Sequence, residues 1–369
     1  MRPYSGRIFT LLKNAEDNIM SRKALGIAGA YVAWIMGSGF ATGQEIFQFF
    51  TSYGYKSFII LTINLVGFLL VGTEVLEAGQ RHRLDENFNH FEYYCGKKLG
   101  TFYSWFMPLN MFGILIVMVS GAGTALNEYF GLSHVVGAFI MAALTFMSYT
   151  IGFKRFVRIV SFIGPVIIGF TLIVGLVTVI RNSADISGIG SCSSEMEEKQ
   201  PVPFWWLSAL LYISYNLWAG SKYYFALGSQ APSVKDAKAG AVMGTIAIML
   251  GILLMNIAMM TDMKNVLIFG VPTLYLARQI SYVLGALFSV ILLMGIFSAS
   301  SAMIWMICDK FTVQGTRKGN ITAAVICISV FLLGLLPFAS LIGVLYTFSG
   351  YAGFILIGCI IYRRFKGTE

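Results

Sequence analysis

Charged side chains are scarce in this sequence. Aspartate, glutamate, lysine and arginine together make up 12% of the 369 residues, whereas hydrophobic residues make up 57%. Soluble globular proteins typically contain about 25% charged residues. The scarcity of charge therefore excludes an ordinary soluble domain and indicates an all-α integral membrane protein that crosses the bilayer several times.

Histidine and cysteine are also few. The three histidines have no metal-ligand spacing, and the five cysteines are widely scattered without a Cys-x-x-Cys pair. The sequence contains no glycine-rich phosphate loop and no nucleophile beside an evident base. We therefore expect that the protein is not an enzyme, and that it has no resident cofactor, no disulfide framework and no metal cluster.

The net charge of +9 could suggest a nucleic-acid partner. However, lysine and arginine occur in short segments between apolar runs and not in one patch. Most of these segments fall on one side of the predicted membrane, so the positive-inside rule places both termini in the cytoplasm. We expect a multi-pass protein of the plasma membrane, surrounded by lipid and without a nucleic-acid partner.

Hydropathy predicts ten transmembrane helices. A membrane helix needs about 20 apolar residues. The predicted spans are 25–51, 57–79, 102–127, 134–152, 158–181, 204–228, 238–260, 282–308, 321–338 and 340–362. The second five follow the first five at an offset of about 180 residues, and an odd number of spans in each half makes the repeats inverted. This gives a cytoplasmic tail (1–23), a first repeat (24–181), an outer loop (182–203), and a second repeat with a short tail (204–369).

The first span is interrupted by three glycines and a carboxylate between Gly37 and Glu45. Irregular backbone is tolerated at membrane depth only where it lines a cavity or is buried in protein. Thr42 and Glu45 have the spacing of a capping box, which predicts a second half-helix beginning at Thr42. Its N-terminal N–H groups and positive dipole would face a carboxylate, while the first half-helix would offer carbonyls to a cation.

The sixth span has a similar polar interruption between Tyr212 and Lys222, which predicts a second broken helix near Ala219. Interrupted segments at corresponding places in two halves indicate a binding site. The candidate substrate-binding residues are Gly37, Ser38, Gly39, Phe40, Thr42, Tyr215, Asn216 and Trp218. Lys222 is a charge within a span, which by default marks a functional site or a buried ion pair.

Each of these signals has a structural alternative. The glycines could serve only close helix packing, and serines in a span often bond back to their own helix. Glu45 could be only a capping carboxylate, and the aromatic residues around Lys222 could belong to the bundle core. Glu77 and Arg81 are predicted to pair at i,i+4 near the end of the second span. Val271-Pro272 predicts a short outer helix that ends at Ile280 and could act as a lid.

The layout resembles the LeuT-type fold of the APC superfamily, with five plus five inverted spans and a discontinuous first and sixth helix. The segments Gly37–Glu45 and Ser214-Tyr215-Asn216 resemble most closely the YkvI-like bacterial membrane proteins. In LeuT-type sodium symporters, carbonyls of the first break and hydroxyls of the eighth span hold sodium. The resemblance implies a sodium site at the Ala33 and Met36 carbonyls with Ser300 or Ser301.

The coupling ion stays open between sodium and a proton. The candidate ion-coupling residues are Glu45, Lys222, Ser298, Ser300 and Ser301. Oxygen ligands suit a hard cation such as sodium. A buried lysine releases its proton more readily than an exposed one, so Lys222 could carry the proton instead. Lys222 has no counterpart in the sodium symporters.

We therefore predict a secondary active transporter that moves a small organic solute, an amino acid or an amine, by ion-coupled alternating access. The alternative is a membrane receptor on the same fold, similar to germinant receptors, that binds a solute without transport. Fold analogy alone does not separate these two functions.

Overall fold

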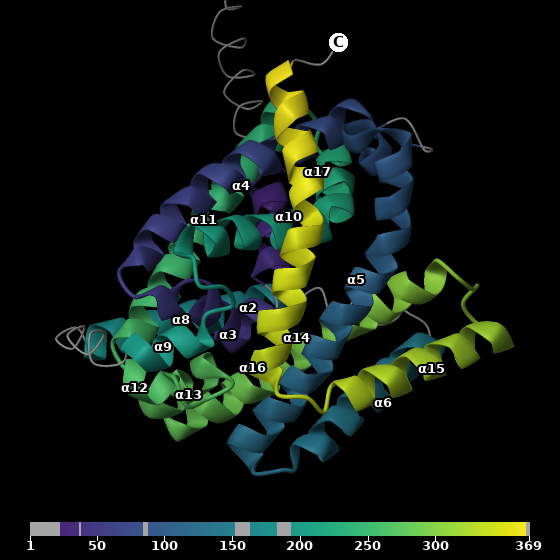
Figure 1. The fold of residues 1–369 in the computed structure, drawn as a ribbon. Coiled ribbons are helices and arrows are strands. Elements are labelled where there is room, and N and C mark those ends of the chain that lie inside the picture. Colours follow the sequence, from purple (N-terminus) through teal and green to yellow (C-terminus); the bar gives the residue numbers. More distant parts are fainter. Residues whose placement is uncertain (1–22, 37, 84–87, 152–162, 183–192, 367–369) are drawn as a thin grey trace, which may run out of the picture.

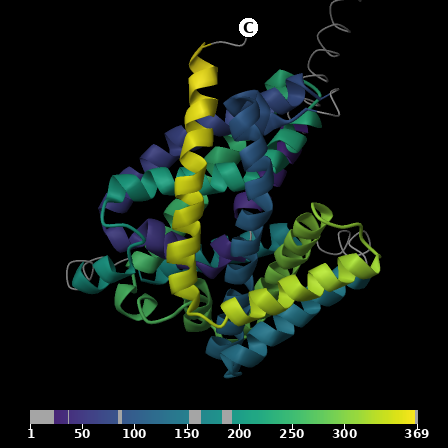
Figure 2. The same ribbon diagram turned by 45° about the vertical axis from the view of Figure 1, so that its right-hand side comes forward.

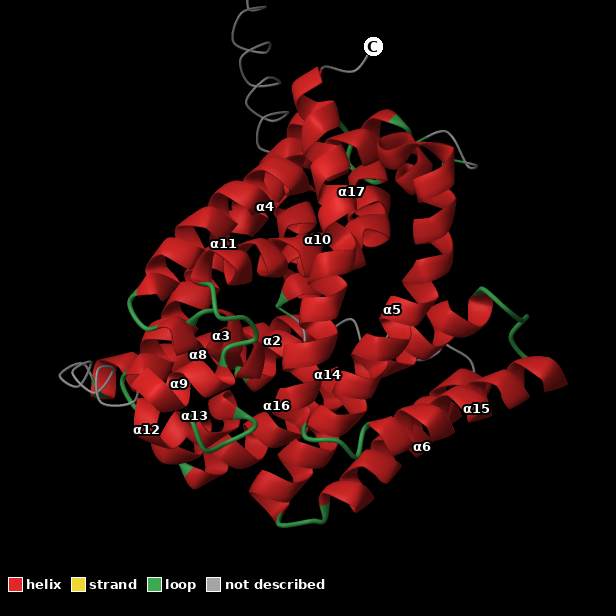
Figure 3. Cartoon of the chain, viewed as in Figure 1, coloured by secondary structure: helices red, strands yellow, loops and turns green. Residues whose placement is uncertain are grey.

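The computed structural model describes residues 23–36, 38–83, 88–151, 163–182 and 193–366. Over these residues the chain is helical, with short turns and loops and no strand (Figure 3). Residues 1–22 of the predicted cytoplasmic tail and 183–192 of the predicted outer loop lie outside the described residues. The all-helical prediction is thus confirmed for the part of the chain that the structure describes.

Within the described ranges, six helices are long and apolar enough to cross a membrane. They are Lys56–Arg81 (α4), His90–Phe130 (α5), His134–Ile151 (α6), Val234–Met260 (α11), Tyr282–Asp309 (α14), and Phe338–Lys366, which contains α16 (Phe338–Leu341), a π-helical turn η3 (Ile342–Tyr346) and α17 (Thr347–Lys366). Each matches one predicted span. The ten-helix count stays a prediction, because the first span is divided and residues 158–162 of the fifth are not described.

The other helices are shorter or more polar. They are a helix at Lys23–Ile35, then α2 (Ser38–Thr42), α3 (Gln44–Phe49), the 3-10 turn η1 (Thr51–Tyr53), α8 (Ile163–Arg181), α9 (Ser193–Lys199), α10 (Trp205–Ser229), α12 (Met263–Val266), α13 (Pro272–Ile280) and α15 (Arg317–Leu333). The short helix predicted after Val271 is confirmed as α13, which begins with Pro272 in its first turn; its place on the outer side stays a prediction. Proline suits this position because the first-turn N–H groups have no partner within the helix.

The helices form two groups (Figures 1 and 2). In one, α10 packs against α4 and α17, and α11 also lies against α4. In the other, α6 and α15 lie side by side, next to α5 and α14. The divided first span lies between the groups, where α2 contacts α14 and α3 contacts α10 and α11.

Large apolar side chains point outward along these helices. On α15, Ile321, Val325, Ile328 and Leu332 are all exposed. Their spacing of three to four residues places them on one face of the helix. Exposure of such an apolar stripe to water is unfavourable, whereas contact with lipid is favourable, which agrees with a membrane protein.

The predicted pair at the end of α4 is confirmed. Arg81 Nη2 lies 2.5 Å from Glu77 Oε1, and Lys238 Nζ of α11 lies 2.8 Å from Glu77 Oε2. Because both lysine and arginine are about half exposed, this network adds at most about 1 kcal/mol per pair. It links the ends of α4 and α11.

We predict that Gly79→Ala destabilises the contact between α4 and α10. A Cβ at Gly79 would lie 2.1 Å from the Phe225 carbonyl oxygen, and a Cβ at Gly228 would lie 2.1 Å from the Leu76 carbonyl oxygen. Backbone cannot yield as a side chain can, so the unfolding free energy should fall by about 1–3 kcal/mol. Thermal unfolding of the purified protein measures this. Gly169→Ala in α8 is the control, because a Cβ there meets nothing within 4 Å; equal melting temperatures for both variants would contradict the prediction.

Candidate functional site

The first span is not a single helix. The helix Lys23–Ile35 is followed by two short helices, α2 and α3, with a glycine in the left-handed conformation between them. The helix Lys23–Ile35 ends before Gly37, which lies outside the described residues, and α2 and α3 are separated by Gly43 at φ 80°. A Cβ at Gly43 would lie 2.4 Å from Thr273 Oγ1 of α13 and 2.5 Å from Met259 Cε of α11. Both the backbone angle and the space therefore require glycine. The predicted break in this span is present.

The predicted capping box is wrong. Helix α3 begins at Gln44 and not at Thr42, and Gly43 precedes it without a side-chain cap. Thr42 Oγ1 instead donates to the Gly39 carbonyl at 2.7 Å and accepts from the Gln44 N–H at 3.3 Å. The left-handed glycine ends the helical path after Thr42, so the threonine stabilises the turn between the two helices. Glu45 is thereby free of a capping role.

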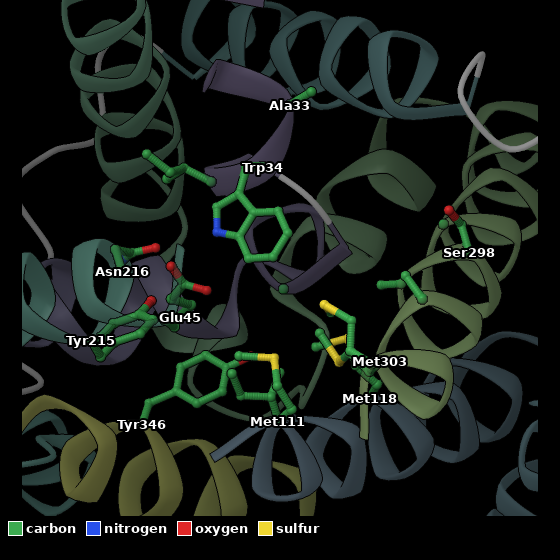
Figure 4. Close-up of a pocket in the computed structure, with 18 of the residues that line it drawn as sticks. Ala33, Trp34, Glu45, Met111, Met118, Tyr215, Asn216, Ser298, Met303 and Tyr346 are labelled. Carbon is green, nitrogen blue, oxygen red and sulfur yellow. The ribbon is translucent and has the colours of Figure 1, made fainter. Parts of the chain in front are cut away.

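Glu45 is the central group of the site. Its side chain is 3% exposed, and its Oε1 has no hydrogen-bond partner among the described residues. The hydroxyl groups of Tyr212 and Tyr215 lie beside the carboxyl group, and Tyr346 approaches it from η3. Figure 4 shows Glu45 next to Tyr215 and Asn216 at the edge of a cavity. A buried carboxyl group in this position is a candidate ligand for a cation.

The cavity beside Glu45, called the central cavity below, has a volume of about 280 Å³. It lies where the first span, α5, α10, α14 and η3 meet (Figure 4). Its lining residues are Ala33, Trp34, Ile35, Gly39, Glu45, Met111, Ile114, Met118, Ile167, Tyr215, Asn216, Ala219, Gly295, Ser298, Ala299, Ala302, Met303, Met306 and Tyr346. Glu45 is the one acidic residue in this set, which contains no lysine, arginine or histidine. The cavity is thus apolar and aromatic with a single acidic group.

Gly39 holds the backbone close to this carboxyl group. A Cβ at Gly39 would lie 3.0 Å from Glu45 Oε2 and 3.2 Å from the Tyr346 hydroxyl. Any larger residue would therefore push the carboxyl group or the tyrosine ring away from its place. This is a more specific role than helix packing.

Tyr346 was not predicted from the sequence. It closes the π-helical turn η3, and its ring lies 4.9 Å from that of Tyr215. Tyr215 also lies 5.4 Å from Tyr212, so three tyrosines are packed in a row beside Glu45. Wide π-helical turns are frequent at functional sites, but hydropathy does not reveal them. Trp34 and four methionines of the lining were missed for a similar reason, because each looks like an ordinary apolar membrane residue.

The predicted break in the sixth span is wrong. Helix α10 is continuous from Trp205 to Ser229. Two of its polar side chains bond to their own helix, because Asn216 Nδ2 donates to the Tyr212 carbonyl at 3.1 Å and Ser221 Oγ donates to the Trp218 carbonyl at 2.8 Å. Ser214 Oγ donates instead to the Gly350 carbonyl of α17 at 2.6 Å. Gly220 serves close packing, since a Cβ there would lie 2.6 Å from Trp34 Nε1. The structural alternative holds for this segment.

The structure separates the predicted substrate-binding residues. Gly39, Tyr215 and Asn216 line the central cavity. Phe40 and Thr42 are buried and do not line it. Trp218 is also buried elsewhere, among Phe91, Tyr103 and Phe106, and its Nε1 donates to Ser349 Oγ at 3.2 Å. Nothing is described for Gly37 or for the Ser38 side chain.

The three serines of α14 also differ. Ser298 lines the central cavity, while Ser300 is fully buried and its Oγ has no partner among the described residues. Ser301 Oγ donates to the Phe297 carbonyl at 2.7 Å. Ala33 lines the cavity and Met36 is buried. The predicted sodium site therefore stays untested, with one of its hydroxyls already bonded to its own helix.

Lys222 lies in a second cavity, called the open cavity below. The open cavity is bordered by the start of α5, the second half of α10 and the end of α14, and it shares Trp34, Met111, Ala219 and Met306 with the central cavity. Lys222 is exposed there, together with Asp309 and Lys310. The expectation of a lysine buried within a span is therefore wrong, because this part of α10 faces the open cavity.

The open cavity adjoins the central cavity, with which it shares four lining residues, and it contains exposed residues. The Trp34 ring stacks on Tyr223 at 4.7 Å where the two cavities meet. On the opposite side, Thr273 of α13 and Met259 of α11 cover Gly43. Glu128 of α5 accepts from the Gly270 and Val271 N–H groups at 2.6 and 3.1 Å and so fastens the start of α13. The site is open toward one end and covered toward the other.

Comparison with known proteins agrees with this architecture. The chain is 23% identical over 339 residues to the membrane protein YkvI of Bacillus subtilis, a match that covers 92% of this chain and 95% of that protein. Two solved structures are similar: a mutant of a manganese transporter of Eremococcus coleocola (TM-score 0.53, 17% identity, 89% of this chain and 76% of that one) and Mhp1 in an inward facing conformation (TM-score 0.52, 15% identity, 93% and 75%). No family model matches the chain.

We predict that Ser298→Cys reacts with a small water-soluble thiol reagent and that Ser300→Cys does not. Ser298 lines the central cavity, which joins the open cavity, whereas Ser300 is two residues away and 0% exposed. Labelling of both variants is counted by mass spectrometry after the five native cysteines are replaced. Similar labelling of Ser300→Cys would show that the described cavity is not the accessible one.

Proposed function

We propose that this chain, a YkvI-like membrane protein with the LeuT-type fold, is a secondary transporter of a small organic cation. The observation that carries the proposal is the single acidic group of the central cavity. A charged residue at membrane depth costs at least about 2.5–3.5 kcal/mol and is kept in general for a function. Glu45 has no basic residue among the lining residues to offset its charge.

The lining favours an amine over an amino acid. The rings of Trp34, Tyr215 and Tyr346 can attract a cation through their faces, with about 0.5–2 kcal/mol for each well-placed contact. The carboxylate end of an amino acid would bring a second negative charge beside Glu45, and the lining residues include no basic side chain to offset it. The cation would therefore bind with its charge at Glu45 and its apolar part against the methionines.

A metal cation fits these residues less well. Divalent manganese is held by several carboxylate, carbonyl or water oxygens. The described residues contain no group of three or more histidine, cysteine, aspartate or glutamate side chains that could hold a metal ion. The similarity to a manganese transporter thus extends to this chain's fold, while its lining supports an organic substrate.

Alternating access is part of the proposal. The route through the open cavity and the cover formed by α13 describe a site that faces one side of the membrane. Transport requires a second state in which α13 moves away from Gly43 and Trp34 closes the route on the other side. The ten-helix arrangement in two inverted halves, with both termini in the cytoplasm, belongs to this proposal as the basis for the two states.

We predict that Glu45→Gln lowers the affinity for the amine about 10- to 100-fold, since a hydrogen bond to a charged group contributes about 1.5–3 kcal/mol. Ligands are first found by thermal shift with ethanolamine, putrescine, choline, the common amino acids and manganese. A ligand at 100 times its Kd adds about 2.7 kcal/mol of apparent stability. Uptake is then measured in proteoliposomes that contain only this chain.

The matched control is Glu197→Gln, because Glu197 is exposed on α9. Its binding and uptake should equal those of the native protein. Uptake that survives Glu45→Gln would contradict the proposed site. Binding without any uptake would instead favour the receptor, and stabilisation by manganese alone would favour a metal substrate.

A further inference from the structure

In the part of the chain that the structure describes, the groups that face Glu45 come from several elements, and none of them is basic. Helix α10 contributes Tyr212 and Tyr215, and η3 contributes Tyr346. Thr273 of α13 and Met259 of α11 approach the neighbouring Gly43. The first span brings the backbone of Gly39 to within contact of the carboxyl group.

A carboxylate in such surroundings needs a positive partner. Transfer of an isolated carboxylate from water to a medium of low dielectric costs tens of kcal/mol in the Born limit, and in practice such a group becomes neutral instead. Tyrosine hydroxyls can donate hydrogen bonds to it but bring no positive charge. The neighbours named above therefore leave two ways to neutralise the site, a proton on the carboxyl group or a cation beside it.

These two partners exclude each other. A proton bound to Glu45 removes the charge that attracts the cation, and a cation beside Glu45 supplies the neutralisation that the proton would otherwise give. The carboxyl group is also confined, because a Cβ at Gly39 would lie only 3.0 Å from Oε2. One carboxyl group thus serves both partners in turn.

We propose that Glu45 exchanges a proton for the organic cation, so that the protein is an antiporter of these two ions. The inference rests on the proposed function and adds its coupling ion. When the cation binds, the O–H bond of the carboxyl group breaks, its electron pair stays on the oxygen, and the proton passes to water in the open cavity. No group is oxidised or reduced. For a singly charged cation, the site is neutral in both loaded states.

Of the ion-coupling candidates predicted from the sequence, this proposal assigns the coupling to Glu45. Lys222 is exposed in the open cavity and does not line the central cavity. Ser301 Oγ is bonded to the Phe297 carbonyl. Of the acidic and basic side chains among these candidates, Glu45 alone is both buried and part of the central cavity lining.

The test is infrared difference spectroscopy on the purified full-length protein, at neutral pH and without sodium. The ligand-free native protein should show a carboxylic-acid C=O band that is missing in Glu45→Gln and present in Glu197→Gln. The cation that binds in the thermal-shift panel is then added. The band should disappear, and a pH indicator in weakly buffered solution should record about one proton released per bound cation.

Choline is the sharpest probe in the panel, because its quaternary ammonium carries no proton of its own and any proton released must come from the protein. Absence of the band in the ligand-free protein would overturn the exchange. Binding with the band unchanged would also overturn it and leave the proposed function standing. Binding that requires sodium would replace the proton by sodium as the coupling ion. Failure of every cation to bind would overturn the proposed function, and the exchange with it.

Discussion

The carboxyl group of Glu45 has no basic side chain beside it among the residues that the structure describes, and the site depends on this constraint. Glu45 occupies that place because Gly43 interrupts the helix and Gly39 leaves room for its oxygens. Three tyrosines from α10 and η3 surround it, and they bring hydroxyl groups without charge. Under the proposed function a mobile ion balances this charge, in contrast to the structural ion pairs of Glu77 with Arg81 and Lys238.

The sequence predicted those features of the structure that depend on a short stretch of residues alone. Apolar length predicted the long helices, and proline after Val271 predicted α13. The glycines around Glu45 predicted the interruption of the first span, because little else explains three glycines and an acid within an apolar run. These signals depend on the residues themselves and not on their neighbours in space.

The predictions were wrong where the same residue types are found both in broken helices and in continuous ones. Asn216 and Ser221 bond back to α10, and Gly220 admits Trp34, so a polar and glycine-containing segment forms a continuous helix. Lys222 was wrongly assigned to the interior, because hydropathy does not tell which face of a helix borders an open cavity. The position of Tyr346 depends on the π-helical turn η3, and no residue type in Ile342–Tyr346 predicts such a turn.

The π-helical turn at Ile342–Tyr346 adds one residue to a helix that otherwise turns by about 100° per residue. The helix faces before and after this turn are therefore rotated relative to each other. Up to the turn, Phe338 packs against Gly121 of α5, and after it Gly350 and Gly353 pack against α10. Removal of one residue would leave a regular helix in which these two surfaces can no longer face their partners together. The extra residue thus changes the rotation of the helix after the turn relative to the helix before it. As a result, the chain contacts α5 before the turn and α10 after it, and Tyr346 points toward Glu45.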